Sequence, residues 1–203
     1  MALDRQQVID EALLVLDDRG LDALSLRTLA GRLGVQAPTL YWHIGSKAEL
    51  LDALADAILD DALRAIPTPG TDDNWAEWLL TALTELRGAM LRHRDGARIV
   101  SGARLSLGRA DFSESAMSTL VGHGVELQRA RLLVLAGERA TLGYVLEEQA
   151  PVDETQQPPD VEELRRRFPV MTEAIGDYFS SGRNSDDLYR DIARLILGLP
   201  PQS

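Results

Sequence analysis

Residues 24–47, LSLRTLAGRLGVQAPTLYWHIGSK, decide the fold of this chain. They predict two short helices joined by a three-residue turn. Ser25 is a favourable N-cap for the first helix, and Gly34 can take the left-handed conformation that ends it. Pro38 suits the first turn of the second helix, predicted over residues 38–44, because its φ is fixed near the helical value and its missing N–H is not needed there. This arrangement is a helix-turn-helix.

Helices are also predicted on both sides of this motif. Apolar residues recur at helical spacing over residues 4–19, and a glycine follows as a stop signal. Ser46, with Glu49 three residues later, forms a capping box for a fourth helix over residues 46–66. Two prolines and a glycine follow within four residues, so a boundary is expected there.

The rest of the chain is predicted to be helical as well. Apolar stripes favour helices over five further segments: residues 75–90, 110–121, 127–149, 161–179 and 186–199. Residues 150–160 contain three prolines and predict a loop. No segment shows a clear strand pattern, so the predicted fold class is all-α.

Composition excludes several classes of protein. The chain has 203 residues, 45% of them hydrophobic, which is enough for a folded core without disulfides. It contains no cysteine, so a disulfide framework, a thiolate nucleophile and a cysteine-bound metal are excluded. The N-terminal residues carry charge from Asp4 onward and no run of about 18 apolar residues occurs. We therefore expect a cytoplasmic protein with no membrane partner.

Charge is distributed unevenly along the chain. The formal net charge is −11, which argues at first against a nucleic-acid partner because phosphate binding depends on cations. Between Asp22 and Glu49, however, there is no acidic residue, and the only charged side chains are Arg27, Arg32 and Lys47. A small acid-free surface on an acidic molecule attracts a polyanion to one face. Chance, or a neutral core segment, would give the same pattern.

The second helix of the motif has an unusual set of side chains. Aromatic and hydrogen-bonding groups, rather than charged ones, crowd two turns at five positions: Pro38, Thr39, Tyr41, Trp42 and His43. One end of such a short helix fits a major groove of DNA. Alternatively, Tyr41 and Trp42 pack the interior of the domain.

Three stretches resemble one family. Residues 24–54, LSLRTLAGRLGVQAPTLYWHIGSKAELLDAL, resemble the DNA-binding domain of the TetR family, and the LYWH run followed by Lys47 is similar to its tetracycline repressors. RHRDGARIVSGAR at residues 92–104 and TLGYVLE at residues 141–147 resemble two segments of the repressors' C-terminal domain. The resemblance weakens after about residue 150.

The resemblance implies an all-α homodimer that binds double-stranded DNA. Two N-terminal heads would enter successive major grooves of a palindromic operator, about 34–36 Å apart. Three parts are implied here: a helix-turn-helix DNA-binding domain over residues 1–45, a connecting helix over 46–66, and a ligand-binding and dimerisation domain over 67–203. Residues 127–149 and 186–199 match the helices of the family's four-helix dimer interface. In the family, the connecting helix couples ligand binding in the C-terminal domain to DNA binding by the heads.

DNA contacts are implied at eight matching positions: Arg27, Ala37, Pro38, Thr39, Tyr41, Trp42, His43 and Lys47. Arg27 matches an arginine that reads a guanine, a contact worth about 1–3 kcal/mol of discrimination. Pro38 and Tyr41 match groups that lie against base methyls and the backbone. The others contact phosphates or brace the helix, except Ala37, which replaces a base-reading glutamine. The operator is therefore expected to differ from that of the tetracycline repressors.

A ligand pocket is implied at seven matching positions: Leu63, Ala82, Leu86, Val100, Arg104, Ala116 and Glu147. Val100 replaces the histidine that binds the metal of a magnesium–tetracycline complex, so we expect no metal site, no cofactor and no response to that drug. Arg104 and Glu147 are retained as polar anchors. A largely apolar small molecule with an acidic or carbonyl group suits this set. Alternatively, the apolar members fill the core and leave no pocket.

No constellation in the sequence supports an enzyme. The three histidines, His43, His93 and His123, have no partner at metal-ligand spacing, and nucleotide-binding and GxSxG motifs are missing. Asp52, Asp56 and Asp60 lie on one helix face, where a solvated stripe is the common explanation. The leading hypothesis is a ligand-responsive repressor. The alternatives are an activator or effector-independent regulator of the same fold, and a helical binding or scaffold protein that does not read an operator.

Overall fold

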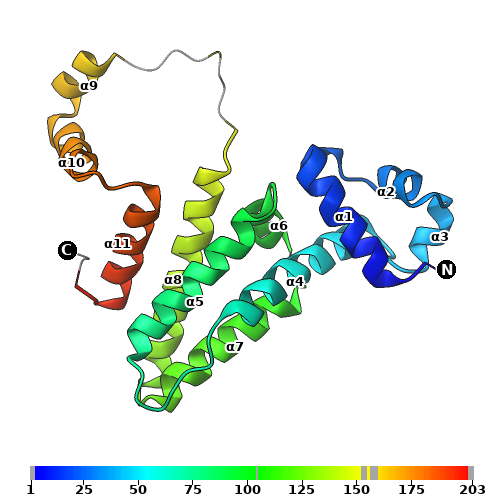
Figure 1. Cartoon of the computed structure of the whole chain (residues 1–203), viewed down its shortest axis with the longest axis horizontal. Helices are drawn as coiled ribbons and strands as arrows, with labels where there is room; N and C mark the ends of the chain where they lie inside the picture. The colour runs from blue at the N-terminus through cyan, green and yellow to red at the C-terminus, as the bar shows by residue number, and fades with distance from the viewer. Residues whose placement is uncertain (1–2, 104, 152–154, 156–159, 201–203) are drawn as a thin grey trace.

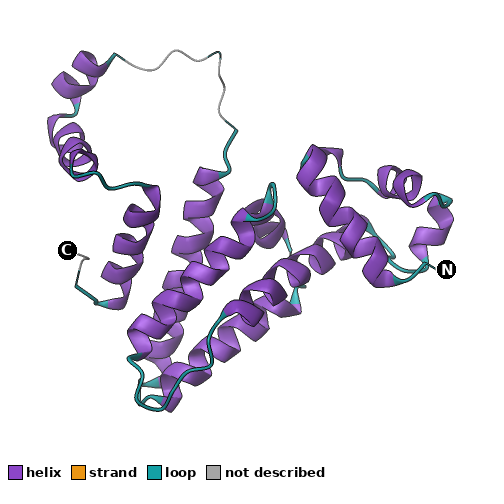
Figure 2. Ribbon diagram, in the orientation of Figure 1, coloured by secondary structure: helices purple, strands orange, loops and turns teal. Residues whose placement is uncertain are grey.

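The computed structural model describes residues 3–103, 105–151, 155 and 160–200. Within these ranges it is helical and contains no strand, which confirms the predicted all-α class (Figures 1 and 2). The elements are α1 (Arg5–Arg19), the 3₁₀ turn η1 (Leu21–Ala23), α2 (Leu26–Leu33), α3 (Ala37–Tyr41), α4 (Lys47–Ala65), α5 (Trp75–Leu91), α6 (Gly96–Gly102), α7 (Leu107–Gly122), α8 (Leu127–Glu148), α9 (Val161–Arg167), α10 (Pro169–Ser180) and α11 (Ser185–Leu197).

The head consists of α1, α2, α3 and the start of α4. The caps predicted from the sequence are present: the Ser25 hydroxyl accepts a hydrogen bond from the Thr28 N–H at 3.0 Å, and Gly34 has a φ of 66°. Leu40 of α3 is completely buried and anchors this helix on the head. The helix-turn-helix therefore forms where its local signals predicted it.

The predicted length of the third helix is wrong. It was expected over residues 38–44, but α3 ends at Tyr41 and a tight turn follows. Ile44 is fully buried, and its N–H bonds to the Leu40 carbonyl at 2.8 Å. The predicted capping box also forms only in part, because Glu49 accepts from the Gly45 N–H at 2.8 Å rather than from that of Ser46.

The larger core is built from α5, α6, α7, α8 and α11. The connecting helix α4 leaves the head and packs against α5, α6 and α7 (Figure 1). Fully buried leucines from α4 and α5, such as Leu54, Leu79 and Leu83, join the two parts in one hydrophobic core. Burial of each such side chain stabilises the fold by roughly 1.5–3 kcal/mol. No helix among the described residues is long and apolar enough to span a membrane.

Helix α11 is fixed to the core by a buried arginine. Arg87 of α5 donates to Glu148 of α8 at 2.9 Å and to Asp186 of α11 at 2.7 Å. These bonds raise the pKa of Arg87 further above its ordinary value. Beside it, Tyr189 donates to the Leu83 carbonyl at 2.9 Å, and burial raises the pKa of Tyr189 to about 12.

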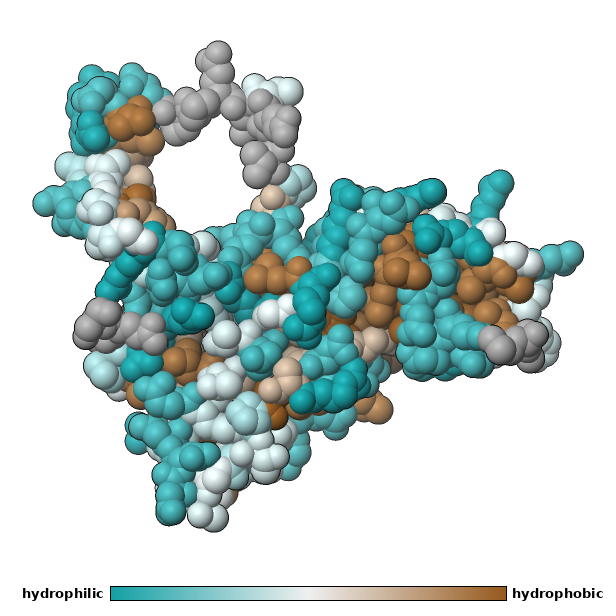
Figure 3. All heavy atoms as spheres, in the orientation of Figure 1, coloured by the Kyte–Doolittle hydropathy of each residue, from teal (hydrophilic) through white to brown (hydrophobic). Residues whose placement is uncertain are grey.

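Between α8 and α11, the single helix predicted over residues 161–179 is wrong. The chain breaks at Phe168, which has φ −133° and ψ 57°, because the ring of Pro169 disfavours a helical conformation in the residue before it. The resulting helices α9 and α10 project from the molecule (Figure 1), and hydrophobic patches lie on this part of the surface (Figure 3). Val170 and Ile175 of α10 are among its exposed hydrophobic residues. The loop predicted over residues 150–160 falls largely outside the described residues.

Candidate functional site

The head presents one exposed surface made by α3 and the two helix starts beside it. Tyr41 and Trp42 are 55% and 88% exposed, so the alternative that they pack the interior is wrong. Arg27, near the start of α2, and Lys47, the first residue of α4, are also exposed. Their side chains have no hydrogen bond or ion pair within the part of the chain that the structure describes. These groups are free to bind a ligand outside the molecule.

The remaining predicted contact positions lie on or beside α3. Pro38 and Thr39 are exposed, whereas Ala37 and His43 are half-buried, and Ala37 packs against the core of the head. The fully buried Leu40 lies between them in sequence and holds the helix in place. The eight predicted positions therefore lie on α2, on α3, in the turn after α3 and at the start of α4.

The charge of this surface is smaller than the sequence indicated. Arg32 is bound to α1, where it lies 2.5 Å from Glu11 and 3.3 Å from Asp18. Only Arg27 and Lys47 remain as unpaired cations of the acid-free segment. Lys47 also begins a 19-residue helix, whose free N–H groups and dipole favour an anion such as a phosphate at that end.

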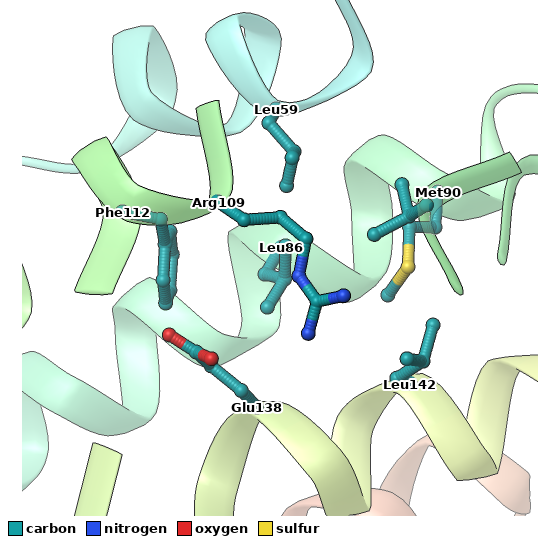
Figure 4. A pocket seen from close by; sticks show the side chains of 8 residues that line it. Leu59, Leu86, Met90, Arg109, Phe112, Glu138 and Leu142 are labelled. Atoms are coloured by element: carbon teal, nitrogen blue, oxygen red, sulfur yellow. The ribbon is translucent and has the colours of Figure 1, made fainter. Parts of the chain in front are cut away.

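The core contains a small, mostly apolar cavity of about 20 Å³ (Figure 4). It is lined by residues from five helices, α4 to α8: Leu59, Leu86, Met90, Val100, Arg109, Phe112, Glu138 and Leu142. This volume is enough for about one water molecule. A drug-sized ligand needs several hundred Å³, so side chains or helices must move before one can enter. This conformation therefore agrees better with the alternative that apolar side chains fill the core than with an open ligand pocket.

Two of the seven predicted ligand positions, Leu86 and Val100, line this cavity. Ala82 and Ala116 are buried in the core, and Leu63 is half-buried, but none of them lines it. Glu147 is exposed on α8 and does not line the cavity. Arg104 lies outside the described residues.

The polar groups of the cavity are Arg109 and Glu138, which sequence reasoning missed. Figure 4 shows Arg109 extending from α7 into the cavity, toward Glu138 and Leu142 of α8. The Arg109 side chain has no hydrogen bond or ion pair within 4 Å among the described residues. A usable signal existed for Glu138: the buried positions Val134 and Thr141 lie one helical turn before and after it.

The environment of Glu138 favours its neutral form. Burial raises the pKa of Glu138, although the Ser113 hydroxyl and the charges of Arg109 and Arg139 act in the opposite direction. The Ser113 hydroxyl donates to the carboxylate at 2.5 Å. The cavity therefore combines an unpaired guanidinium group with a carboxyl group that takes up a proton more readily than usual. No group of three potential metal ligands occurs among the residues that the structure describes.

Comparison with known proteins identifies both parts of the chain. Residues 8–54 match the model for bacterial regulatory proteins of the tetR family, and residues 66–201 match the tetracyclin repressor-like C-terminal domain. The tetracycline repressor protein class C of Escherichia coli is 40% identical over 148 residues, which cover 73% of this chain and 67% of that protein.

Two solved structures have similar folds. A TetR variant from Acinetobacter baumannii AYE has a TM-score of 0.72 and 30% identity, with 97% of this chain and 96% of that chain covered. BioQ has a TM-score of 0.63 and 30% identity, with 87% of this chain and 97% of that chain covered. The chain therefore belongs to the TetR family, whose members are DNA-binding transcription regulators and not enzymes, as the sequence predicted.

Proposed function

We propose that the chain is a repressor that binds a palindromic operator as a homodimer and is released by a small, largely apolar effector. Residues 1–45 form the reading head, 46–66 the connecting helix, and 67–203 the effector-binding and dimerisation domain. The observation that carries the proposal is the exposed surface around α3, where Trp42 is 88% exposed. A large aromatic side chain in this position is costly in water and useful at an interface.

The roles on DNA follow from the chemistry of this surface. Arg27 reads a guanine, Tyr41 and Pro38 lie against base methyls and backbone, and Lys47 binds a phosphate. The structure of BioQ with its natural double-stranded DNA operator supports this mode of binding for a related fold. Ala37 has only a methyl group, so it selects a thymine methyl or leaves that base less specified.

The dimer is supported by apolar faces on α8 and α11 that no part of the described chain covers. Leu195 and Leu132 are 80% and 62% exposed, and Ile192 and Ala136 are exposed one turn away on the same helices. A Cβ atom at Gly143 of α8 would contact nothing, so another helix can approach closely there. Helices α8 and α11 pack side by side, so two such pairs would form a four-helix interface.

The effector is proposed to bind at the α4–α8 cavity, which would enlarge on binding. The free guanidinium of Arg109 suits an acidic or carbonyl group, and the carboxyl group of Glu138 suits a hydroxyl or amine. The surrounding leucines, Met90 and Phe112 suit an apolar ligand body. A ligand that prefers the enlarged state lowers operator affinity only by its difference in affinity for the two states.

We predict that this effector is not magnesium–tetracycline. The related TetR variant from A. baumannii was solved in complex with minocycline. In the present chain Val100, an apolar cavity residue, takes the place of the expected metal-binding histidine. Saturating tetracycline with magnesium should leave the operator complex intact in a mobility-shift assay. Release at micromolar drug would contradict the prediction.

The proposed function is tested by selecting random and genomic duplexes with the purified protein, with Tyr41→Ala as the matched variant. We expect an enriched palindrome that is lost in the variant, and this duplex then serves as the probe in an effector screen. If nothing is enriched at low salt, the protein is a helical binding or scaffold protein instead.

A second candidate is a regulator of the same fold that needs no effector. The small volume of the cavity, about 20 Å³, favours it. A genomic footprint that stays unchanged through the effector screen and under all growth conditions would support this candidate over a ligand-released repressor.

A further inference from the structure

Two carboxylates in the middle of α4 hold the start of α7. The Asp56 carboxylate accepts hydrogen bonds from the Ser106 hydroxyl at 2.7 Å and from the Gly108 N–H at 3.0 Å. Asp52, one turn earlier, accepts from the Leu105 N–H at 3.2 Å. These contacts correct the interpretation of the aspartate stripe as merely solvated. Only Asp60, the third member, is exposed and has no hydrogen bond or ion pair within the described ranges.

The two helices are also in very close contact at this point. A Cβ atom at Gly108 would lie 3.1 Å from the Leu59 Cβ and 3.3 Å from the Asp56 Cα. Gly108 is therefore the residue that lets the backbone of α7 approach α4. Since the joint is both hydrogen-bonded and tightly packed, α7 cannot shift along α4 without breaking it.

The joint lies between the effector cavity and the reading head. Arg109 follows Gly108 directly and Phe112 comes one turn later, and both line the cavity. Leu59, one turn after Asp56 on α4, lines it too. At its other end, α4 begins with Lys47 beside α3. Any movement of α7 that enlarges the cavity must therefore act on the same helix that carries a DNA contact.

We propose that Asp56 is the positioning residue that transmits movement of α7 to α4, and so links the cavity to the head. This inference rests on the proposed function, because it assumes operator binding by the head. The hydroxyl of Ser106 and the N–H of Gly108 make Asp56 a two-point clamp on the first turn of α7. Without these two hydrogen bonds, the head still folds and binds DNA, but the cavity no longer responds to DNA binding by the head.

Reciprocity allows a test that needs no effector. If a movement at the cavity changes the affinity of the head for the operator, operator binding must shift the conformational equilibrium at the cavity by the same free energy. The experiment measures amide hydrogen exchange of α7, Leu107–Gly122, in the full chain with and without the selected operator duplex. Asp56→Ala removes the carboxylate oxygen that accepts both hydrogen bonds, and Asp60→Ala is the matched control on the same helix.

We expect operator binding to change exchange in α7 by about fivefold or more in the parent and in Asp60→Ala. In Asp56→Ala the change should fall below about twofold, while operator affinity stays within about threefold of the parent. Gly108→Ala, which pushes α7 from α4 without removing a charge, should reduce the change as well.

Three results would overturn the proposal: an undiminished response in Asp56→Ala, an equal loss in Asp60→Ala, or no response of α7 in the parent. A merely structural role for Asp56 would lower stability in every state but leave the operator-dependent difference in place. A parent protein that binds no duplex would overturn the proposed function itself, and this inference with it.

Discussion

At the scale of single residues, the two unpaired cations of the acid-free segment have different expected roles on DNA. Lys47 lies at a helix start and Arg27 beside the recognition helix α3, and both are exposed. Lys47→Ala should weaken binding to all duplexes and lower the slope of log affinity against log salt by about one unit. Arg27→Ala should instead relax the preference at one base position.

Arg32→Ala is the internal control for these two variants. Because Arg32 is bound to Glu11 and Asp18, its removal should leave the salt slope nearly unchanged. Fluorescence anisotropy at several salt concentrations measures all three proteins. If Lys47→Ala and Arg27→Ala bound DNA as the parent does, the assignment of the recognition surface would be wrong.

Glu138 makes the stability of the core depend on pH. Burial raises the pKa of this carboxyl group above its ordinary value of 4.5 in the folded state. Between the ordinary and the raised pKa, the folded protein binds more protons than the unfolded one, so the free energy of unfolding falls as pH rises through this window. Glu138→Gln should therefore stabilise the protein more at pH 8 than at pH 4.

Denaturant unfolding at several pH values measures this difference. The exposed Glu147 on the same helix is the matched position, and Glu147→Gln controls for the loss of one carboxyl group. A stability gain from Glu138→Gln that is equal at both pH values would show that the carboxyl group is not held in an unfavourable ionised state.

At the scale of helices, local signals predicted the ends of elements well and long-range packing decided the rest. The caps at Ser25 and Ser46 and the stop at Gly34 depend on a few neighbouring residues, so the sequence was sufficient. The early end of α3 depends on the burial of Ile44 against other helices. Helix α6, which is not among the helices predicted from the sequence, has seven residues and packs against α4 and α5.

The same division applies to the candidate sites. The proposed DNA-contact residues could be grouped from the sequence because they lie within one short stretch of it. The cavity joins five helices, so Leu86 and Val100 were expected while Arg109 and Glu138 were not. A charged residue on an amphipathic helix is usually assigned to solvent, and only the tertiary arrangement shows that these two face inward.

The junction of α5 and α6 depends on one glycine. A Cβ atom at Gly96 would lie 2.2 Å from the backbone oxygen of Met90, and Asp95 before it already has a left-handed φ of 59°. Gly96→Ala must displace backbone, so we expect the free energy of unfolding to fall by about 2–3 kcal/mol. Gly88→Ala on α5, where the Cβ has ordinary contacts, should raise it by about 0.5–1 kcal/mol.

Urea unfolding of the two alanine variants measures both values. Gly88→Ala controls for the general gain in helix propensity when a glycine is replaced. Equal effects of the two substitutions would show that α6 adjusts to the methyl group and that the close approach at Met90 is not required.

At the scale of the molecule, the head is held to the core by polar contacts as well as by α4. The Asp95 carboxylate accepts from the Leu21 N–H at 2.8 Å, and Asp17 lies 3.1 Å from the ring of His93. Burial opposes ionisation of Asp95, but the Leu21 N–H and Arg98 together lower its pKa. A hydrogen bond to a charged group contributes about 1.5–3 kcal/mol, so these contacts help to fix the orientation of the head on the core.

A palindromic operator requires two heads at a fixed separation, so DNA binding and dimerisation should fail together. Leu195, 80% exposed on α11, is the most exposed large side chain of the proposed interface. Leu195→Glu places a charge in the centre of a contact that is expected to exclude water, and each buried, unpaired charge costs several kcal/mol. We expect sedimentation to show one chain instead of two at micromolar concentration.

Operator affinity should fall by at least about a hundredfold in Leu195→Glu, because one head alone makes half of the contacts and gains nothing from the second half-site. Val121→Glu, an exposed apolar residue at the end of α7, is the matched control and should leave the dimer and its affinity unchanged. A Leu195→Glu protein that is monomeric yet binds the full operator as tightly as the parent would exclude the two-headed mode of binding. A variant that stays dimeric would place the interface on another surface, and the exposed apolar side chains of α10 would be the next to test.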